Sequence, residues 1–232
     1  MALRVTASKE VITALVKKHP GRFSAELGID LSSGRSPEIF RWFLASVLFG
    51  ARISENIVKK TFHEFDTRGI VSPENILHIG WDGLVAMLDA GGYVRYDFKT
   101  ATKLLDLCKA LTENYHAELA NLHTAAIDPK DLEQRLTSLA KGIGEVTVNI
   151  FLREMRGIWE KANPLPSDLV VMAAKERGLV PKTVKDRAKV LHLLMGAWKE
   201  TGMKKKDFSD FEAALVRAGM ELRRKKRCGS GK

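Results

Sequence analysis

A pair of glycines in the middle of the chain could bind an anion through backbone atoms. Gly142 and Gly144 flank Ile143 between two segments of helical periodicity, so one helix would end and another start at once. Glycine permits the positive φ that such a tight turn demands, and its missing side chain lets another backbone approach. The amide N–H groups that begin the second helix suit a DNA phosphate, and Lys141 and Thr147 lie beside them. A plain turn between two packed helices is the alternative reading of the glycines.

A carboxylate lies 24 residues further along, at a second helix start. Asp168 follows Ser167 and precedes the apolar residues 169–171. Ser and Asp are both preferred N-cap residues, because their side-chain oxygen accepts a hydrogen bond from the first turn. Asp168 could therefore be a cap, a carboxylate held ready for chemistry, or both.

The charge balance indicates a polyanionic partner. The 232 residues include 38 Lys plus Arg and 28 Asp plus Glu, a net charge of +10, and the pI is near 9.6. Ten basic and four acidic residues lie between Lys204 and Lys232, so the charge is concentrated in a C-terminal tail. A basic balance of this size is typical of nucleic-acid binding, although a solvated tail has the same composition.

Several classes of protein are excluded. The 45% hydrophobic content is that of a globular protein, no apolar run approaches a membrane span, and the N-terminus turns polar too soon for a signal peptide. We therefore expect a cytoplasmic protein, nucleoid-associated if prokaryotic, with no membrane partner. Cys108 and Cys228 fit no disulfide framework, the six His show no metal-ligand spacing, and the phosphate-binding and hydrolase motifs are missing. No metal site is expected.

The elements that must position these residues are helices. Ser36-Pro37-Glu38 and Ser72-Pro73-Glu74 combine an N-cap, a proline at the first helical position and an early acid. Further helices are predicted from Ser54 to about Phe65, around 84–88, from Asp97, from Asp128-Pro129, after Gly144, over 169–177, near 184–198 and over 208–222. No alternating strand pattern exceeds four residues. The fold class is therefore all-α, with about ten short helices.

These motifs together resemble the helix-hairpin-helix DNA glycosylases of the endonuclease III superfamily. That family has a hairpin of the form LPGVGxKTA followed by an Asp at a helix start, which residues 136–148 and Asp168 resemble. Residues 40–54 look like the family's early core helix and the loop that probes the duplex. Ala90-Gly91-Gly92-Tyr93 is similar to its glycine-tyrosine turn, and residues 226–230 look like the remains of its iron–sulfur loop.

The resemblance covers residues 36–232 and implies a two-lobed helical glycosylase fold. Its first lobe would be a six-helix domain over 36–160, with the helix-hairpin-helix motif at about 130–156. Residues 161–232 would form a C-terminal helical lobe that carries the catalytic Asp at its start and ends in the basic tail. Residues 1–35 would pack with that lobe.

Two departures from the family pattern bear on the chemistry. Bifunctional members carry a nucleophilic Lys two residues beyond the second hairpin glycine, and this chain has Val146 there. Of the four Cys ligands of the cluster only Cys228 matches, so no iron–sulfur cluster is expected. No cofactor is expected, beyond a monovalent cation that the hairpin backbone could hold. The spacing to Asp168 is about four residues longer than usual, around 158–163.

The resemblance implies a monofunctional glycosylase that acts on double-stranded DNA containing a damaged base, with an alkylated purine as the favoured substrate. Asp168 would be catalytic, since a carboxylate beside the sugar stabilises the positive charge that builds as the base leaves. Lys141, Gly142, Ile143, Gly144 and Thr147 would bind DNA, together with Arg52 and Arg95. The protein would act as a monomer. A non-catalytic DNA-binding module and a glycosylase with lyase activity are the alternatives.

Overall fold

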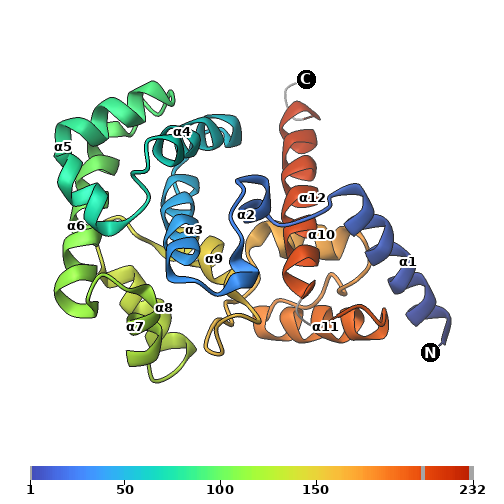
Figure 1. Ribbon diagram of the computed structural model, residues 1–232. Coiled ribbons are helices and arrows are strands. Elements are labelled where there is room, and N and C mark those ends of the chain that lie inside the picture. Colours follow the sequence, from blue (N-terminus) through green and yellow to red (C-terminus); the bar gives the residue numbers. More distant parts are fainter. Residues whose placement is uncertain (1, 205–206, 230–232) are drawn as a thin grey trace. The chain divides into compact units, whose positions relative to one another are not determined.

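The computed structural model describes residues 2–204 and 207–229, and within them the chain is all helical (Figure 1). The predicted fold class is confirmed. The described residues form twelve α-helices and one 3-10 helix. These are α1 (Ala2–Lys18), α2 (Phe23–Glu26), η1 (Leu31–Ser33), α3 (Ser36–Phe49), α4 (Glu55–Thr67), α5 (Pro73–Ala90), α6 (Asp97–Tyr115), α7 (Leu119–Ala125), α8 (Pro129–Ser138), α9 (Glu145–Met155), α10 (Asp168–Glu176), α11 (Arg187–Glu200) and α12 (Phe208–Gly229). None of them is long and apolar enough to cross a membrane.

The chain divides into two compact units. The central unit is residues 24–163 and holds η1 and α3 to α9. The terminal unit is made of residues 1–23 and 164–232, so it joins α1 to α10, α11 and α12. The boundary at Asn163 and Pro164 falls between the hairpin and Asp168.

Helix α3 lies at the core of the central unit. Trp42 and Phe43 on this helix have no exposed surface. Trp42 Nε1 donates a hydrogen bond of 3.1 Å to the Phe151 carbonyl on α9, and the rings of Phe43 and Phe151 meet edge to face, 5.0 Å apart. Burying such aromatic side chains is strongly stabilising, so these contacts fix α9 against α3.

In the terminal unit, α12 packs closely against α10. A Cβ atom on Gly219 of α12 would lie 2.4 Å from the Leu169 carbonyl oxygen on α10, so only glycine allows the two backbones to approach this closely. Trp198 of α11 stacks on Phe211 of α12 with 5.5 Å between the rings. These contacts hold the first turn of α10 in place.

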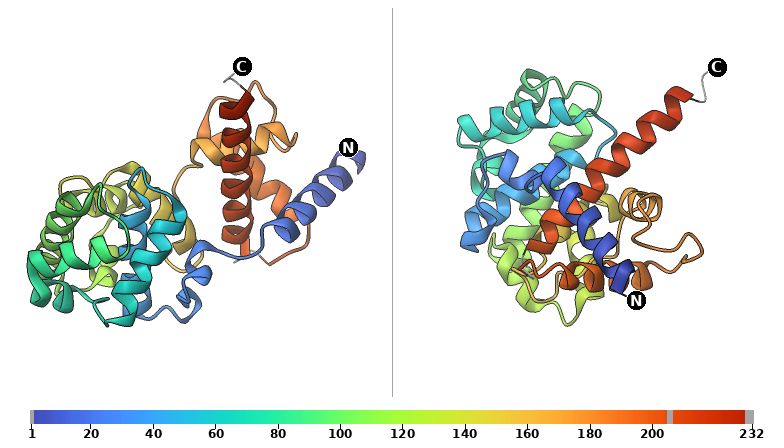
Figure 2. Two further views of the ribbon diagram at one scale, coloured as in Figure 1. Left: turned by 90° about the horizontal axis from the view of Figure 1, so that it is seen from above. Right: turned by 90° about the vertical axis from the view of Figure 1, so that its right-hand side faces the viewer.

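Two predicted elements need correction, and two helices were missed. Helix α12 runs unbroken to Gly229, as Figures 1 and 2 show, so residues 226–229 are its last turn and not the remains of a loop; Ser230 lies outside the described residues. Helix α11 begins at Arg187, because Asp186 caps it, and not near 184. Helices α1 and α7 were not predicted, and α7 has no side-chain cap hydrogen bond at its start.

Candidate functional site

Helices α8 and α9 meet at a tight turn that carries the glycine pair. The Ile143 amide donates a hydrogen bond of 3.1 Å to the Ala140 carbonyl, and the Ile143 side chain is buried. The hairpin predicted from the sequence is therefore present, and it is anchored to the core by the residue between its glycines. Because Ile143 is buried, only its backbone is available to a ligand.

The two glycines do different things. Gly142 has φ +92°, a conformation that residues with a Cβ rarely adopt. Gly144 has φ −116° and ψ −179°, ordinary extended backbone, and a Cβ built on it would meet nothing within 4 Å. The turn therefore requires glycine only at Gly142. At Gly144 the missing side chain leaves the start of α9 open.

The N-terminus of α9 has no side-chain cap. Gly144 is its N-cap, and no described residue accepts a hydrogen bond from the N–H groups of Glu145, Val146 or Thr147. Free N–H groups at the positive end of a helix dipole form an anion site. The negative charge of Glu145 would repel an anion at this position, so nearby cations must offset it. Lys141, which is exposed beside the turn, is one such cation.

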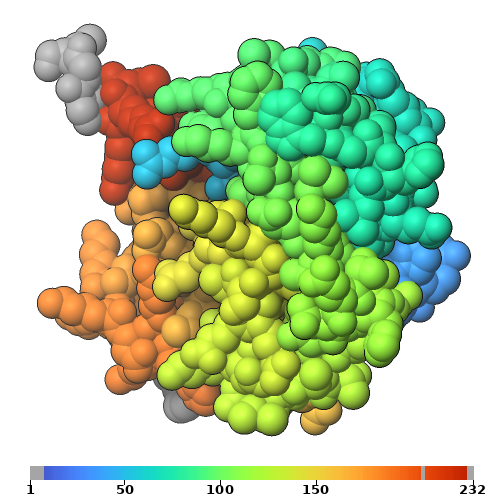
Figure 3. All heavy atoms as spheres, turned by 90° about the vertical axis from the view of Figure 1, so that its left-hand side faces the viewer, coloured from blue at the N-terminus to red at the C-terminus, as the bar shows by residue number. Residues whose placement is uncertain are grey.

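Lys103 on α6 supplies a second cation that the sequence analysis missed. A Cβ atom on Gly142 would lie 3.0 Å from Lys103 Cε and 3.6 Å from Nζ, so this side chain extends along the turn. Burial lowers the pKa of Lys103, and no described residue forms an ion pair or hydrogen bond with it. Figure 3 shows the hairpin segment in yellow at the surface next to the green of α6. Nothing local in the sequence could link residues 39 positions apart.

The other residues predicted to contact DNA, Thr147, Arg52 and Arg95, lie near the C-terminal end of α3. Gly50 lies against Thr147, since a Cβ there would be 2.1 Å from Thr147 Oγ1, and the exposed Arg52 follows two residues later. Tyr93 donates a hydrogen bond of 2.7 Å to the Leu48 carbonyl, which brings the turn carrying Arg95 to the same place.

Two of these residues offer less than the sequence analysis expected. Thr147 is 4% exposed, so its hydroxyl is not presented to a ligand. Arg95 is exposed but lies over the Tyr96 ring, 5.4 Å from the centroid.

Asp168 is the first residue of α10, in the terminal unit. Its neighbour Ser167 is the N-cap, with Oγ accepting from the Val170 amide at 3.5 Å. Asp168 is therefore not the cap. Its side chain is 91% exposed, so the carboxylate faces outward from the head of the helix.

Arg187 holds that carboxylate and is the second residue that the sequence analysis missed. Its Nη2 donates to Asp168 Oδ1 at 2.6 Å, and its Nη1 donates to the Pro166 carbonyl at 3.1 Å. The guanidinium thus bridges the carboxylate and the backbone just before it, which restricts how the carboxylate can turn. Asp168 Oδ2 has no donor among the described residues.

The cysteines do not fit an iron–sulfur site. Cys108 is buried in the core, where burial raises the pKa of its thiol, and Cys228 is exposed on α12. The described residues contain no group of three or more His, Cys, Asp or Glu side chains that could hold a metal ion. We derive no chemistry through a metal.

Comparison with known proteins adds one finding. No family model matches the chain. No curated protein matches it either. Among solved structures, the chain is similar to the H. pylori 3-methyladenine DNA glycosylase MagIII bound to 1,N6-ethenoadenine, with a TM-score of 0.56 and 14% identity over 93% of this chain and 98% of that one. The chain therefore has the same fold as that structure.

The glycosylase fold predicted from the hairpin and Asp168 is thereby confirmed. The similarity extends over nearly the whole of both chains. Since one fold can serve different activities, the activity has to be argued from the site residues.

Proposed function

We propose that this protein is a monofunctional DNA glycosylase that removes a damaged base from double-stranded DNA. The observation that carries the proposal is the exposed carboxylate of Asp168, fixed at the head of α10 in a glycosylase fold. Fold alone does not choose an activity, whereas an outward-facing carboxylate held by a cap and an arginine is suited to one kind of transition state.

Binding would begin at the hairpin. The open N–H groups of α9 and the ammonium groups of Lys141 and Lys103 would hold a backbone phosphate. These contacts carry no sequence information, which suits an enzyme that must scan DNA for lesions. Arg52, close to the same turn, would contact the distorted duplex when the target nucleotide leaves the stack. Extruding a base costs a few kcal/mol, and least where it is damaged or mispaired.

Asp168 would act on the sugar of the extruded nucleotide. As the base departs, positive charge develops on the sugar, and a carboxylate held nearby stabilises it. Arg187 engages Oδ1 and leaves Oδ2 free, so Oδ2 would face the sugar or orient the attacking water. A carboxylate that is already oriented loses little freedom in reaching the transition state.

The residue types at the hairpin favour hydrolysis without strand cleavage. Val146 is 63% exposed in the first turn of α9, at the position where the bifunctional enzymes of the family carry an amine. Val has no nucleophile to form a Schiff base with the sugar. Lys141 precedes the turn and is assigned to a phosphate.

We further propose alkylated purines as the substrate class. The similar H. pylori protein is a 3-methyladenine glycosylase and binds 1,N6-ethenoadenine, two adenines with carbon added to the base. Alkylation of a purine ring nitrogen makes the base a better leaving group, so one aligned carboxylate would suit such a substrate.

The test is base release from duplex DNA that carries 3-methyladenine or ethenoadenine, with an undamaged duplex as the control. Released base is measured by chromatography, and strand breaks are measured with and without alkali. We expect base release, with breaks that appear only after alkali.

Two results would contradict the proposal. Breaks without alkali, together with borohydride trapping on abasic DNA, would show a lyase. Salt-sensitive DNA binding with no base release from either lesion would favour the non-catalytic binding module.

A further inference from the structure

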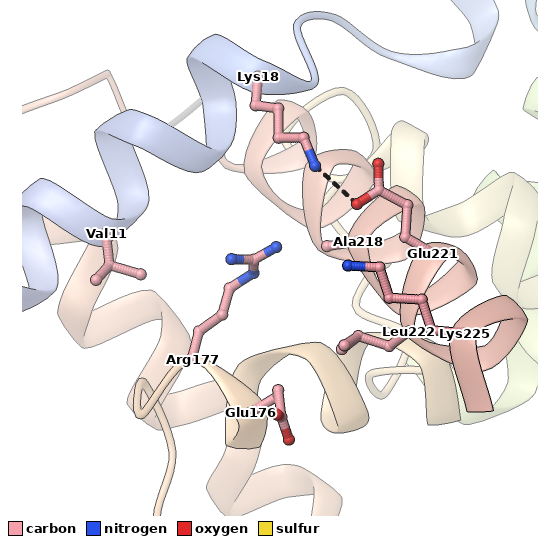
Figure 4. A pocket seen from close by; sticks show the side chains of 8 residues that line it. All are labelled: Val11, Lys18, Glu176, Arg177, Ala218, Glu221, Leu222 and Lys225. Atoms are coloured by element: carbon pink, nitrogen blue, oxygen red, sulfur yellow. Dashed lines mark hydrogen bonds and ion pairs between the residues drawn. The ribbon is translucent and has the colours of Figure 1, made fainter. Parts of the chain in front are cut away.

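A pocket in the terminal unit collects cationic side chains away from Asp168. It has a volume of about 460 Å³ and lies between α1, the end of α10 and α12 (Figure 4). Its lining residues are Val11, Lys18, Glu176, Arg177, Ala218, Glu221, Leu222 and Lys225. Asp168 begins α10 and the pocket lies at its other end, about 12 Å away at 1.5 Å per residue. The pocket is therefore separate from the proposed catalytic carboxylate.

Arg177 is the central group of this pocket. No described carboxylate lies within ion-pair distance of it, and its Nε is buried with no hydrogen-bond partner. A buried donor without an acceptor is unfavourable, so an acceptor supplied by a ligand would be stabilising. In Figure 4 the cationic ends of Lys18 and Lys225 lie around the same space as the Arg177 guanidinium.

The acidic side chains of the pocket do not neutralise its cations. Glu221 accepts from Lys18 Nζ at 2.8 Å and lies 3.6 Å from His19 Nε2, so its charge is already balanced. The pKa of the His19 imidazole is lowered, mainly by burial. Glu221 opposes this effect, and the positive charges of Lys18, Arg217 and Arg177 add to it. Glu176 also lines the pocket, but in Figure 4 its carboxylate points away from the Arg177 guanidinium. Arg177 and Lys225 thus remain available to an anion.

We propose that this pocket is a binding site for a phosphate group. The guanidinium fork of Arg177 matches phosphate oxygens, and Lys225 adds a second charge from the facing helix. Val11 on α1 and Ala218 and Leu222 on α12 add apolar surface to the lining of the pocket, which suits a phosphate attached to an organic group rather than a bare ion. The phosphate belongs either to a nucleic-acid backbone or to a free nucleotide, two sources of the same chemistry.

The test follows binding and needs no catalytic activity, so its outcome is independent of the proposed function. The full-length protein is titrated with inorganic phosphate and then AMP, and the Arg177 Nε–H resonance is followed by ¹H–¹⁵N NMR, assigned by its loss in Arg177→Gln. Undamaged duplex DNA is titrated by fluorescence anisotropy over a range of salt concentrations. Lys225→Gln is the second pocket variant, and Arg224→Gln is the matched control, since Arg224 is exposed on the same helix one residue away and does not line the pocket.

If the phosphate comes from a free nucleotide, AMP should shift the Arg177 resonance. Lys225→Gln should then lower the affinity for AMP about 10-fold, and Arg224→Gln should leave it unchanged. A nucleic-acid source predicts that Arg177→Gln and Lys225→Gln each lower the salt slope of DNA binding by about 1, relative to Arg224→Gln. Either result supports the proposal. It is overturned if phosphate and AMP leave the Arg177 resonance unmoved and all three variants share one salt slope.

Discussion

The starts of α9 and α10 are both helix N-termini, yet they are suited to different partners, an anion at α9 and a cation at α10. At α9 the N-cap is Gly144, which has no side chain, and the first N–H groups are left open. At α10 the cap is Ser167, whose hydroxyl already accepts a first-turn N–H, and the next residue is the carboxylate of Asp168. The first start can accept an anion, and the second presents one.

The difference shows how the same dipole serves two purposes. A helix N-terminus favours negative charge in either case. At α9 the cap residue has no side chain, so an anion from outside could occupy the cap position, provided that Lys141 and Lys103 offset the charge of Glu145. Where the chain supplies its own carboxylate, the dipole and Arg187 steady that group, and its free oxygen can stabilise a cation. The two starts therefore differ in the cap residue, Gly144 or Ser167, and in the arginine that holds Asp168.

Removing the carboxylate tests that separation most severely. Asp168→Asn keeps the size of the side chain and removes its charge, so we expect base release to fall by about 100-fold or more, the loss typical of one electrostatic catalytic group. Affinity for undamaged DNA should stay within about 2-fold, because the phosphate contacts lie elsewhere. Single-turnover base release and fluorescence anisotropy measure the two quantities.

The control for Asp168→Asn is Glu200→Gln, which removes an exposed carboxylate from the end of α11 in the same unit. It should leave both quantities unchanged. Base release by Asp168→Asn at the wild-type rate would end the proposed mechanism.

Adding a side chain at the open start should have the opposite profile. Gly144→Ala meets no described atom and needs no unusual φ, so the free energy of unfolding should change by less than about 1 kcal/mol. Its methyl group would stand where a phosphate approaches, and we expect DNA affinity to fall about 10-fold. The rate of base release at saturating protein should be retained.

Gly142→Ala is the informative comparison for this prediction. At φ +92° an alanine should destabilise the fold by about 1–2 kcal/mol. Urea unfolding distinguishes the two glycines. Equal losses of stability in both variants would contradict the different roles assigned to them.

Releasing the carboxylate from its arginine should have a smaller effect. Arg187→Gln removes the 2.6 Å contact to Asp168, and we expect base release to slow about 10-fold with DNA affinity unchanged, because the carboxylate is no longer oriented. Arg187→Lys should recover part of the rate. Stability should change by at most about 1 kcal/mol, since the pair is exposed.

The matched control for Arg187→Gln is Lys189→Gln, an exposed charge on the same helix. If both variants slow base release equally, the effect is one of overall charge. Arg187 would then have no positioning role.

The smallest expected effect is at Lys103. Lys103→Gln should lower the salt slope of DNA binding by about 1 and the affinity about 3-fold, because one phosphate contact is lost. Lys99→Gln, on the exposed side of the same helix, should do less. Equal slopes for the two variants would remove Lys103 from the anion site.

Lys103 also predicts a pH dependence of stability. Burial lowers the pKa of this lysine in the folded protein, so above that value the unfolded chain binds more protons than the folded chain. The contribution of Lys103 to stability should therefore rise with pH between the folded and the unfolded pKa. Urea unfolding at pH 8 and pH 10 should show this component in the wild type and not in Lys103→Gln.

Local sequence was sufficient for most of the helices and for the position of both starts. The Ser-Pro-Glu signals marked the starts of α3 and α5, but only Ser72 is an N-cap, because Ser36 is already the first residue of α3 and Arg35 precedes it as the cap. Asp128 caps α8 as its Asp-Pro pair indicated, and the glycine pair marked the turn. Each of these features depends on hydrogen bonds and backbone angles within a few residues, and such preferences are readable without tertiary structure.

Tertiary structure decided which of those residues are available and what surrounds them. Thr147 is unavailable because Gly50 packs against it, and Lys103 reaches Gly142 from another helix. Arg187 meets Asp168 across 19 residues of chain, and Arg177 meets Lys225 across a pocket. Contacts between distant residues depend on how whole helices pack, so no local pattern encodes them. The sequence by itself determined that a backbone anion site and a carboxylate would each stand at a helix start, and only the packing of the helices decided which side chains complete them.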